Sequence, residues 1–229
     1  MSSSKRAAFR AVLSGSTAVV AGSVWDPISA RIADKLGVRV GLMGGSLGSY
    51  AVLGAPDIIV LTLTEFADQA RRACRASKVS LLVDADHGYG NALNVMRTVE
   101  ELEAAGVAAL TIEDTLLPRA YGAGSKPQLV SVEEGVGKMK AALGARRDKE
   151  LVIVGRTSAH SITDVDDAIR RLKAYEAAGV DALMAPHLHG RAELERIAAA
   201  VRLPLIVGGA QGDLAGADLP YLTGQRVRV

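Results

Sequence analysis

The stretch VSLLVDADHGYGNALNVMRTVEELEAAGVAALTIED, residues 79–114, decides the fold because it holds two strand patterns joined by one helix pattern. Val79–Val83 and Ala108–Ile112 are short apolar runs of the kind that form buried strands, and residues 91–105 have helical periodicity. Gly106 follows that helix, where a left-handed cap favours glycine. The stretch therefore predicts a strand, a helix and a second strand parallel to the first.

The same alternation continues outward in both directions. Further strand-like runs are at Ala18–Ala21, Val38–Met43, Leu151–Val154, Ala182–Met184 and Leu203–Val207, and further helical patterns are near residues 4–13, 26–36, 64–77, 132–145, 164–178 and 190–201. The spacings of Ser131 with Glu134 and of Thr163 with Asp166 are typical of capped helix starts. Seven strands alternating with helices predict one α/β barrel domain, residues 1–229.

The last residues predict an incomplete end to the barrel. Residues 214–222 could form a short helix, and Arg226–Val229 begins what resembles an eighth strand and then stops. A closed barrel needs that strand and normally a helix after it. We therefore expect a (β/α)8 TIM-type barrel truncated at strand eight with its last helix missing, or one completed by another chain.

Composition and charge restrict the class of partner. The formal net charge is +2 and the basic residues are spread along the chain, so neither nucleic acid nor a membrane is an expected partner. No apolar run approaches the length of a membrane span. A single cysteine, Cys74, excludes an internal disulfide and fits the cytoplasm. A small, discrete ligand is the expected partner.

Polar residues follow each of the first five predicted strands. They are Trp25-Asp26, Gly44-Gly45-Ser46, the loop Asp84–Asn91, Glu113-Asp114 and Arg156-Thr157-Ser158. In α/β barrels these positions line the active face. Asp84 and Asp86 alternate at a strand end, so both can point inward. Together with Glu113 they would repel one another unless a cation or a shared proton compensates. Mg²⁺, or alternatively Mn²⁺, is the natural cation because it suits such oxygen ligands.

Plainer interpretations stay open for several of these residues. Asp26, Asp57 and Asp114 taken singly fit helix caps or solvated turns. Arg156 could form a buried structural ion pair, or bind a substrate carboxylate with its planar guanidinium. Gly44-Gly45-Ser46 could be a tight turn, or a set of backbone N–H donors with the Ser46 hydroxyl around an oxyanion or carboxylate.

Several separated motifs resemble the isocitrate lyase and phosphoenolpyruvate mutase superfamily. DADHGYGN (84–91) followed by TIEDTLLP (111–118) is similar to its DxDxGYG and EDxxxP motifs. GSVWDPISARIADKLGVRVGLMGGSLGSYAVLGAPD (22–57) resembles its opening, and RTSA (156–159) its arginine on strand five. The resemblance covers nearly the whole chain, with the motifs in the right order.

The resemblance implies a site and a chemistry. It implies a Mg²⁺ ion near Asp84, Asp86 and Glu113, partly through water, with Asp57 nearby. It also implies that Arg156, Ser46 and neighbouring backbone amides hold the carboxylate and oxo group of a 2-oxo acid. Members of the superfamily make or break a bond next to a 2-oxo or enolate carbon through a magnesium-bound enolate.

The loop after the fourth strand indicates the branch. Lyases of the superfamily have a KKCGH-type cysteine motif there, whereas TLLPRAYGAGSKPQLVS (115–131) has no cysteine, and Thr115 stands where the mutases have lysine. His87, the Tyr121-Gly122 loop and VSVEEGVGKMKAAL (130–143) are most similar to the bacterial oxaloacetate decarboxylase branch. The resemblance implies Mg²⁺-dependent decarboxylation of oxaloacetate, or a related 2-oxo dicarboxylic acid, to pyruvate and CO2.

In this hypothesis each polar group has a role. The acids Asp84, Asp86, Glu113 and Asp57 hold the metal and its waters, and Arg156 and Ser46 hold the C1 carboxylate. His87 and Tyr89 shape the entrance and could supply a proton, and Trp25, Asp26, Gly44 and Gly45 complete the predicted substrate-binding set. A homo-oligomer, a dimer or tetramer, is expected because the superfamily tends to exchange its final helix between subunits.

Three alternatives remain. A lyase or mutase of the same superfamily, acting on a C–C or P–C bond, would use the same site. A shortened barrel that binds ligand without turnover would be catalytically impaired. His187 and His189 form an H-x-H after the sixth strand that would indicate zinc in a metallohydrolase, although such a site needs further histidines and only His87 and His160 remain.

Overall fold

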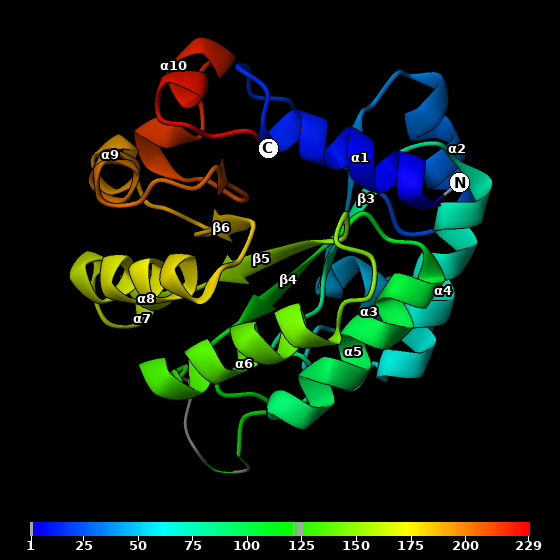
Figure 1. Ribbon diagram of the computed structural model, residues 1–229, viewed down its shortest axis with the longest axis horizontal. Helices are drawn as coiled ribbons and strands as arrows, with labels where there is room; N and C mark the ends of the chain where they lie inside the picture. Colours follow the sequence, from blue (N-terminus) through cyan, green and yellow to red (C-terminus); the bar gives the residue numbers. More distant parts are fainter. Residues whose placement is uncertain (1, 121, 123–125) are drawn as a thin grey trace.

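The computed structural model describes residues 2–120, 122 and 126–229, so Tyr121 of the predicted loop lies outside the described residues. The described strands form one parallel sheet in chain order: β1 (Gly22–Ser23), β2 (Val40–Met43), β3 (Ser80–Asp84), β4 (Ala109–Glu113), β5 (Val152–Arg156), β6 (Ala182–Met184) and β7 (Leu205–Ile206). The sheet curls and helices lie around its outer side (Figure 1). This curled parallel sheet is consistent with the predicted TIM-type barrel.

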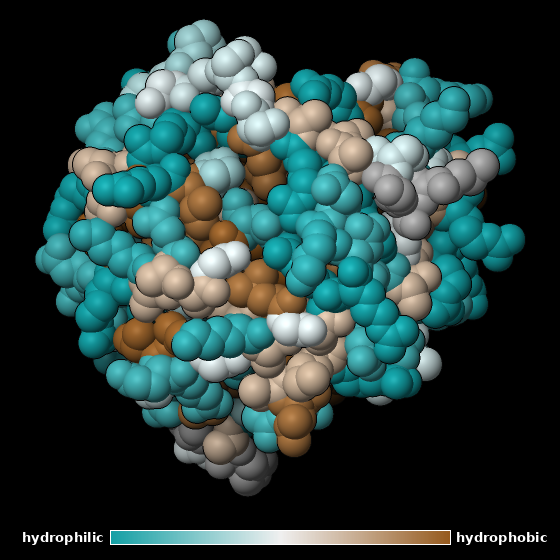
Figure 2. Space-filling view, viewed as in Figure 1, coloured by the Kyte–Doolittle hydropathy of each residue, from teal (hydrophilic) through white to brown (hydrophobic). Residues whose placement is uncertain are grey.

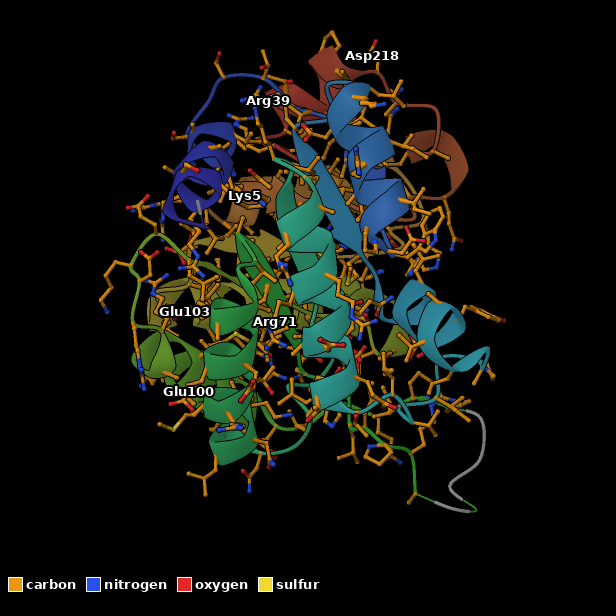
Figure 3. The ribbon with its side chains drawn as sticks, turned by 90° about the vertical axis from the view of Figure 1, so that its right-hand side faces the viewer. Lys5, Arg39, Arg71, Glu100, Glu103 and Asp218 are labelled. Atoms are coloured by element: carbon orange, nitrogen blue, oxygen red, sulfur yellow. The ribbon has the colours of Figure 1, made fainter. Side chains whose placement is uncertain are left out.

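Most helices follow a strand and cover the outside of the sheet. They are α2 (Pro27–Lys35), α4 (Leu63–Ala76), α5 (Ala92–Ala105), α6 (Val132–Ala145), α8 (Val165–Ala178) and α9 (Arg191–Ala200). Neighbouring helices contact one another in chain order, and Figure 3 shows α4 and α5 side by side with the charged residues Arg71 and Glu100 on them. Their apolar faces therefore point to the sheet and their polar faces to solvent.

Helix α1 (Ser2–Leu13) lies across the amino-terminal ends of the strands. Arg6 donates to the carbonyl of Val107, just before β4, and Arg10 donates to the carbonyl of Glu150, just before β5. Phe9 of α1 is fully buried inside the curl. The helix therefore closes the end of the sheet opposite to the carboxyl ends of the strands.

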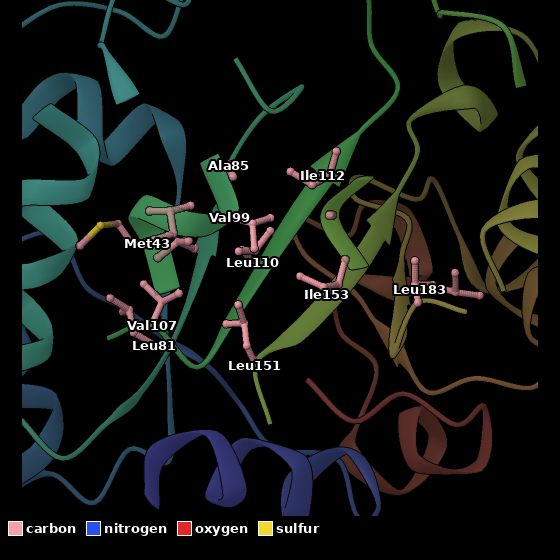
Figure 4. Packing of buried hydrophobic residues seen from close by; sticks show 14 of the residues in the cluster. Met43, Leu81, Ala85, Val99, Val107, Leu110, Ile112, Leu151, Ile153 and Leu183 are labelled. Carbon is pink, nitrogen blue, oxygen red and sulfur yellow. The ribbon is translucent and has the colours of Figure 1, made fainter. Parts of the chain in front are cut away.

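Side chains alternate between two apolar layers along each strand. The inner layer contains Val40, Leu82, Ala109, Val152, Val154 and Ala182, which pack with Phe9 and Val12 of α1. The outer layer lies between the strands and the helices, and Figure 4 shows Leu81, Leu110, Ile112 and Ile153 within it. Because the alternation has a period of two, the inward face of β3, β4 and β5 continues into Asp84, Glu113 and Arg156.

Several predicted boundaries were wrong. The first strand is Gly22–Ser23 rather than Ala18–Ala21, because the parallel ladder with β2 begins only at Gly22. Two helices were not predicted: α3 (Gly45–Leu53), whose sequence GSLGSYAVL has little helical patterning, and the single turn α7 (Ala159–Ile162). The cap of α8 is Asp164, which accepts from the backbone N–H of Asp167 at 2.7 Å, rather than Thr163.

Other local predictions were confirmed. Ser131 accepts from the backbone N–H of Glu134 at 3.1 Å and caps α6. Gly106 and Gly179 end α5 and α8 with φ of 92° and 98°, in the left-handed region that favours glycine. These features depend on a few neighbouring residues, so a local pattern suffices to predict them.

The end of the described chain continues beside β7 without forming an eighth strand. A 3-10 turn at Gly212–Leu214 and α10 (Leu219–Gly224) precede it, where residues 214–222 were predicted to be helical. Val227 makes one parallel bridge with Leu205, and the carbonyl of Arg228 accepts from the N–H of Val19 at 3.0 Å. The last residues thus hydrogen-bond to β7 on one side and to the segment before β1 on the other.

The surface is mixed in character. Figure 2 shows hydrophilic residues over most of the visible face, with smaller hydrophobic groups between them. In the described part of the chain, no helix combines the length and apolar character needed to cross a membrane.

Candidate active site at the carboxyl ends of the strands

Three inward-facing side chains meet at the carboxyl ends of β3, β4 and β5. Glu113 is paired with Arg156 in the register of β4 and β5, and Asp84 with Thr111 in that of β3 and β4. Nη1 of Arg156 lies 2.5 Å from Oδ1 of Asp84, and Nη2 lies 3.4 Å from Oε2 of Glu113. The three residues that the sequence placed at one edge of the sheet are therefore in contact.

Hydroxyl groups hold the two strand-end carboxylates in place. Thr111 donates to Oδ1 of Asp84 at 3.0 Å, and Thr115 donates to Oε2 of Glu113 at 3.0 Å. Burial raises the pKa of Glu113 above its usual value, although Arg156 opposes this shift. Burial by itself would lower the pKa of Arg156, but the carboxylates of Asp84 and Glu113 raise it, so the guanidinium stays charged.

Asp86 lies beyond the end of β3, not within it as the alternation with Asp84 suggested. Its backbone has a φ of 47°, and its carbonyl accepts from the N–H of Glu113 at 2.9 Å. Its carboxylate is still directed to the same site. Burial, followed by repulsion from Asp84, Asp57 and Glu113, raises the pKa of Asp86 to about 9. Asp57, Asp84, Asp86 and Glu113 together form the acid group, and one arginine does not neutralise its four carboxylates.

Gly45 brings the beginning of α3 against the acids. A Cβ atom at this position would lie 2.9 Å from Oδ1 of Asp86 and 3.2 Å from Oδ2 of Asp57, which places both carboxylates beside the same glycine. Gly44 precedes the helix without a side-chain cap. The Gly44-Gly45-Ser46 segment is therefore the start of a nine-residue helix, with N–H groups that lack intrahelical partners, rather than only a tight turn.

His87 and Tyr89 lie in the loop after β3. His87 is buried, and burial together with the charge of Lys138 lowers its pKa to about 4. Lys138 donates to the backbone carbonyl of His87 at 3.0 Å. Burial, followed by repulsion from Asp86 and Asp84, raises the pKa of Tyr89, so its hydroxyl stays protonated. The ring centres of His87 and Tyr89 are 6.3 Å apart.

Trp25 and Asp26 occupy a different part of the surface. Asp26 caps α2 by accepting from the N–H of Ser29 at 2.6 Å, which accounts for its position without a ligand. Trp25 is 40% exposed, and both residues line a hollow of about 480 Å³ together with Glu65 and Arg72. None of the described residues that line this hollow belongs to the acid group. Their predicted role in substrate binding stays a prediction.

The structure also identifies supporting residues that the sequence did not. Asp114 is fully buried, where it accepts from Tyr175 at 2.5 Å and from Arg171 at 3.1 Å. Asp114 is therefore neither a helix cap nor a solvated turn residue, as its position had suggested, but a buried structural group whose partners on α8 had no local signal. Thr111 could have been found from its inward position two residues before Glu113.

A second group of potential ligands lies outside the acid group. Within the described residues, one set of three His, Cys, Asp or Glu ligand atoms lies within 4.8 Å of one another, and it consists of His160, His189 and Glu193. The carboxylates around Arg156 do not form such a set of three within the described residues. His187, the other histidine of the H-x-H motif, instead approaches the carbonyl of Gly209 at 3.3 Å.

Comparison with known proteins places the chain among enzymes of one family. The family model described as phosphoenolpyruvate phosphomutase matches residues 9–228. A relative named oxaloacetate decarboxylase, from Bradyrhizobium diazoefficiens, is 60% identical over 226 residues, which cover 99% of this chain and 77% of the relative.

Two solved structures have a similar fold. Phosphoenolpyruvate phosphomutase from Streptomyces platensis subsp. rosaceus has a TM-score of 0.87 and 32% identity, over 97% of this chain and 78% of that one. Phosphonopyruvate hydrolase in complex with oxalate and Mg²⁺ has a TM-score of 0.79 and 30% identity, over 89% of this chain and 71% of that one.

Proposed function

The chain belongs to the phosphoenolpyruvate phosphomutase family, and we propose that it is a metal-dependent enzyme that decarboxylates oxaloacetate to pyruvate and CO2. The observation that carries the proposal is its 60% identity, over almost the whole chain, to a relative named oxaloacetate decarboxylase. The arrangement of an arginine among carboxylates at the carboxyl ends of the strands supports it, since barrels of this kind do their chemistry there.

We propose Mg²⁺, or alternatively Mn²⁺, as the metal, held by Asp84, Asp86, Glu113 and Asp57, partly through water. The donor set fits, because it consists of carboxylate oxygens and because repulsion from Asp84, Asp57 and Glu113 adds to burial in raising the pKa of Asp86, an effect that a bound cation would relieve. The complex of a related hydrolase with oxalate and Mg²⁺ is consistent with this. Bound there, the ion would supply Lewis-acid stabilisation of the charge that develops on the 2-oxo oxygen.

The substrate would be oriented by groups on both sides of the acids. Arg156 can offer its charged guanidinium to the C1 carboxylate, and its Nε has no hydrogen-bond partner in the described chain. The first N–H groups of α3, at Gly45 and Ser46, together with the Ser46 hydroxyl, can bind a carboxylate or oxo oxygen from the other side. In this arrangement the C4 carboxylate stays free to leave as CO2.

The proton that completes the reaction adds at C3 after the bond between C3 and C4 breaks. Tyr89 suits the role of donor by its position, because its protonated phenol lies beside the acids, although burial and the nearby carboxylates raise its pKa and make it a weaker acid than free tyrosine. His87 suits it less, because its pKa of about 4 leaves the imidazole neutral near pH 7. We therefore assign His87 to shaping the entrance loop, through the hydrogen bond between its carbonyl and Lys138.

The direct test measures pyruvate and CO2 release from oxaloacetate with and without Mg²⁺. Arg156→Gln should lower kcat/KM by about 100-fold or more, as expected when a group that stabilises developing charge is removed. Arg170→Gln is the matched control, because Arg170 is 66% exposed and pairs with Asp167 on its own helix, away from the site. Release no faster than that caused by free Mg²⁺ would contradict the proposal.

A second candidate activity, on a P–C bond, is favoured by the 32% identity to a solved phosphoenolpyruvate phosphomutase. The same preparation should be offered phosphonopyruvate. Formation of phosphoenolpyruvate or inorganic phosphate, with oxaloacetate left intact, would favour this alternative. Turnover of neither substrate would favour a catalytically impaired barrel.

We also propose that residues 1–229 form one domain and that the protein is a cytoplasmic homo-oligomer. A free, buried Cys74 fits a reducing compartment. Exposed apolar side chains on α2 and at its C-cap, namely Ile28 at 69%, Ile32 at 53% and Leu36 at 76%, fit a surface that another subunit covers. Light scattering of the purified chain measures its oligomeric state.

A further inference from the structure

Three side chains from the loops after β5 and β6 form a compact group outside the acid site. His160 lies on α7, which follows β5, whereas His189 precedes α9 and Glu193 lies in its first turn. Figure 1 shows α7, α8 and α9 together beside β6. The acid group has Asp84 at the end of β3 and Glu113 at the end of β4. The two groups of potential ligands therefore come from different strands of the barrel.

The geometry of this group is close to that of a metal site. The rings of His160 and His189 meet edge to face with centres 5.8 Å apart, and Nδ1 of His189 lies 3.2 Å from Oε1 of Glu193. The three ligand atoms lie within 4.8 Å of one another. Because zinc binds histidine nitrogen at about 2.0–2.1 Å, ligand atoms on one ion lie within about 4 Å of one another, so the group would have to contract by about 0.8 Å at most.

His160 provides a second, independent observation. The residue is only 6% exposed, and neither ring nitrogen makes a well-formed hydrogen bond within the described part of the chain, although the ring lies near the backbone carbonyl of His187. Buried polar groups are normally paired, so ring nitrogens without a well-formed hydrogen bond leave His160 free to bind a ligand. Burial also lowers the pKa of His160, which favours the neutral imidazole that binds metals.

Glu193 and His189 are prepared for binding in different ways. The backbone N–H of His189 donates to Oε2 of Glu193 at 2.8 Å, which orients the carboxylate with Oε1 toward the two rings. The side chain of His189 is 54% exposed, so an ion can reach the group from solvent. The group thus offers three ligand atoms, which are a buried nitrogen of His160, an oriented oxygen of Glu193 and an accessible nitrogen of His189. Solvent can supply the fourth.

We propose that His160, His189 and Glu193 bind a first-row divalent transition-metal ion such as Zn²⁺, with water as the fourth ligand. This site is separate from the Mg²⁺ site of the acid group. Two imidazoles and one carboxylate favour such an ion, whereas Mg²⁺ prefers oxygen ligands. The ion would join the loops after β5 and β6. The inference does not depend on the proposed decarboxylase activity.

The test is a titration of metal-free protein with Co²⁺ in the presence of excess Mg²⁺, which occupies the acid site. Tetrahedral Co²⁺ with nitrogen ligands absorbs visible light, so binding is read from the spectrum, and Zn²⁺ should displace the signal. His189→Ala and Glu193→Gln should each weaken Co²⁺ binding by more than about 100-fold, since even a lost outer partner of a ligand costs about 10–100-fold.

His187→Ala is the matched control, because His187 belongs to the same loop but points to Gly209. It should bind Co²⁺ like the unchanged chain. Substitution of the buried His160 could disturb folding, so the two surface ligands carry the test. Absence of a nitrogen-type spectrum, equal binding in the His189→Ala protein, or displacement of Co²⁺ by Mg²⁺ would overturn the proposal.

Discussion

Replacement of Gly45 by alanine tests whether the close approach of α3 to the acids matters for metal and substrate binding. The added Cβ would lie 2.9 Å from Oδ1 of Asp86 and 3.2 Å from Oδ2 of Asp57, whereas ordinary contact begins at 3.4 Å. The Asp86 carboxylate must then retreat by about 0.5 Å, and since a misplacement of about 1 Å can cost about 100-fold in rate, we expect kcat/KM to fall by about 10-fold. The helix itself should tolerate alanine, which has the higher helix propensity.

Gly44→Ala is the control for this substitution. Its Cβ would lie 3.8 Å from the Ser46 hydroxyl, an ordinary contact, and its φ of −76° suits any residue. Two measurements are needed: pyruvate release at saturating Mg²⁺, and the increase in Tm as Mg²⁺ is added, which reports metal affinity without substrate. We expect Gly45→Ala to lose most of both, and Gly44→Ala to keep both. Equal behaviour of the two variants would refute a functional role for this approach.

Two further predictions concern the buried groups behind the site. Arg171→Met leaves the fully buried Asp114 without its cation and should destabilise the fold by about 3–5 kcal/mol, whereas the exposed neighbour Arg170→Met should cost less than about 1 kcal/mol. Urea denaturation measures the free energy of unfolding of both variants. An equal loss in the two would show that the ion pair between Arg171 and Asp114 is dispensable. Burial raises the pKa of Cys74 to about 11, so its thiol should resist alkylation at pH 8 until the chain unfolds; rapid labelling of the native protein would contradict this.

Much of the fold was predictable because its signals are local. Apolar runs, helical periodicity and cap residues identified six of the seven strands near their observed positions and the six covering helices. The first strand was misplaced because its two residues, Gly22 and Ser23, have no β-branched pattern and are recognised as a strand only through pairing with β2. Helix α3 was missed because its glycine- and serine-containing sequence has weak intrinsic helical preference.

The same distinction between local signals and long-range contacts applies to the candidate site. Asp84, Glu113 and Arg156 could be found from the chain, since alternation along a strand and position at its end are properties of a few adjacent residues. The contact of Gly45 with Asp86, the pairing of Asp114 with Arg171, and the meeting of His160 with His189 join residues far apart in the chain. Such contacts depend on where packed helices and loops come to lie, and that is set by the whole core rather than by any short stretch of sequence.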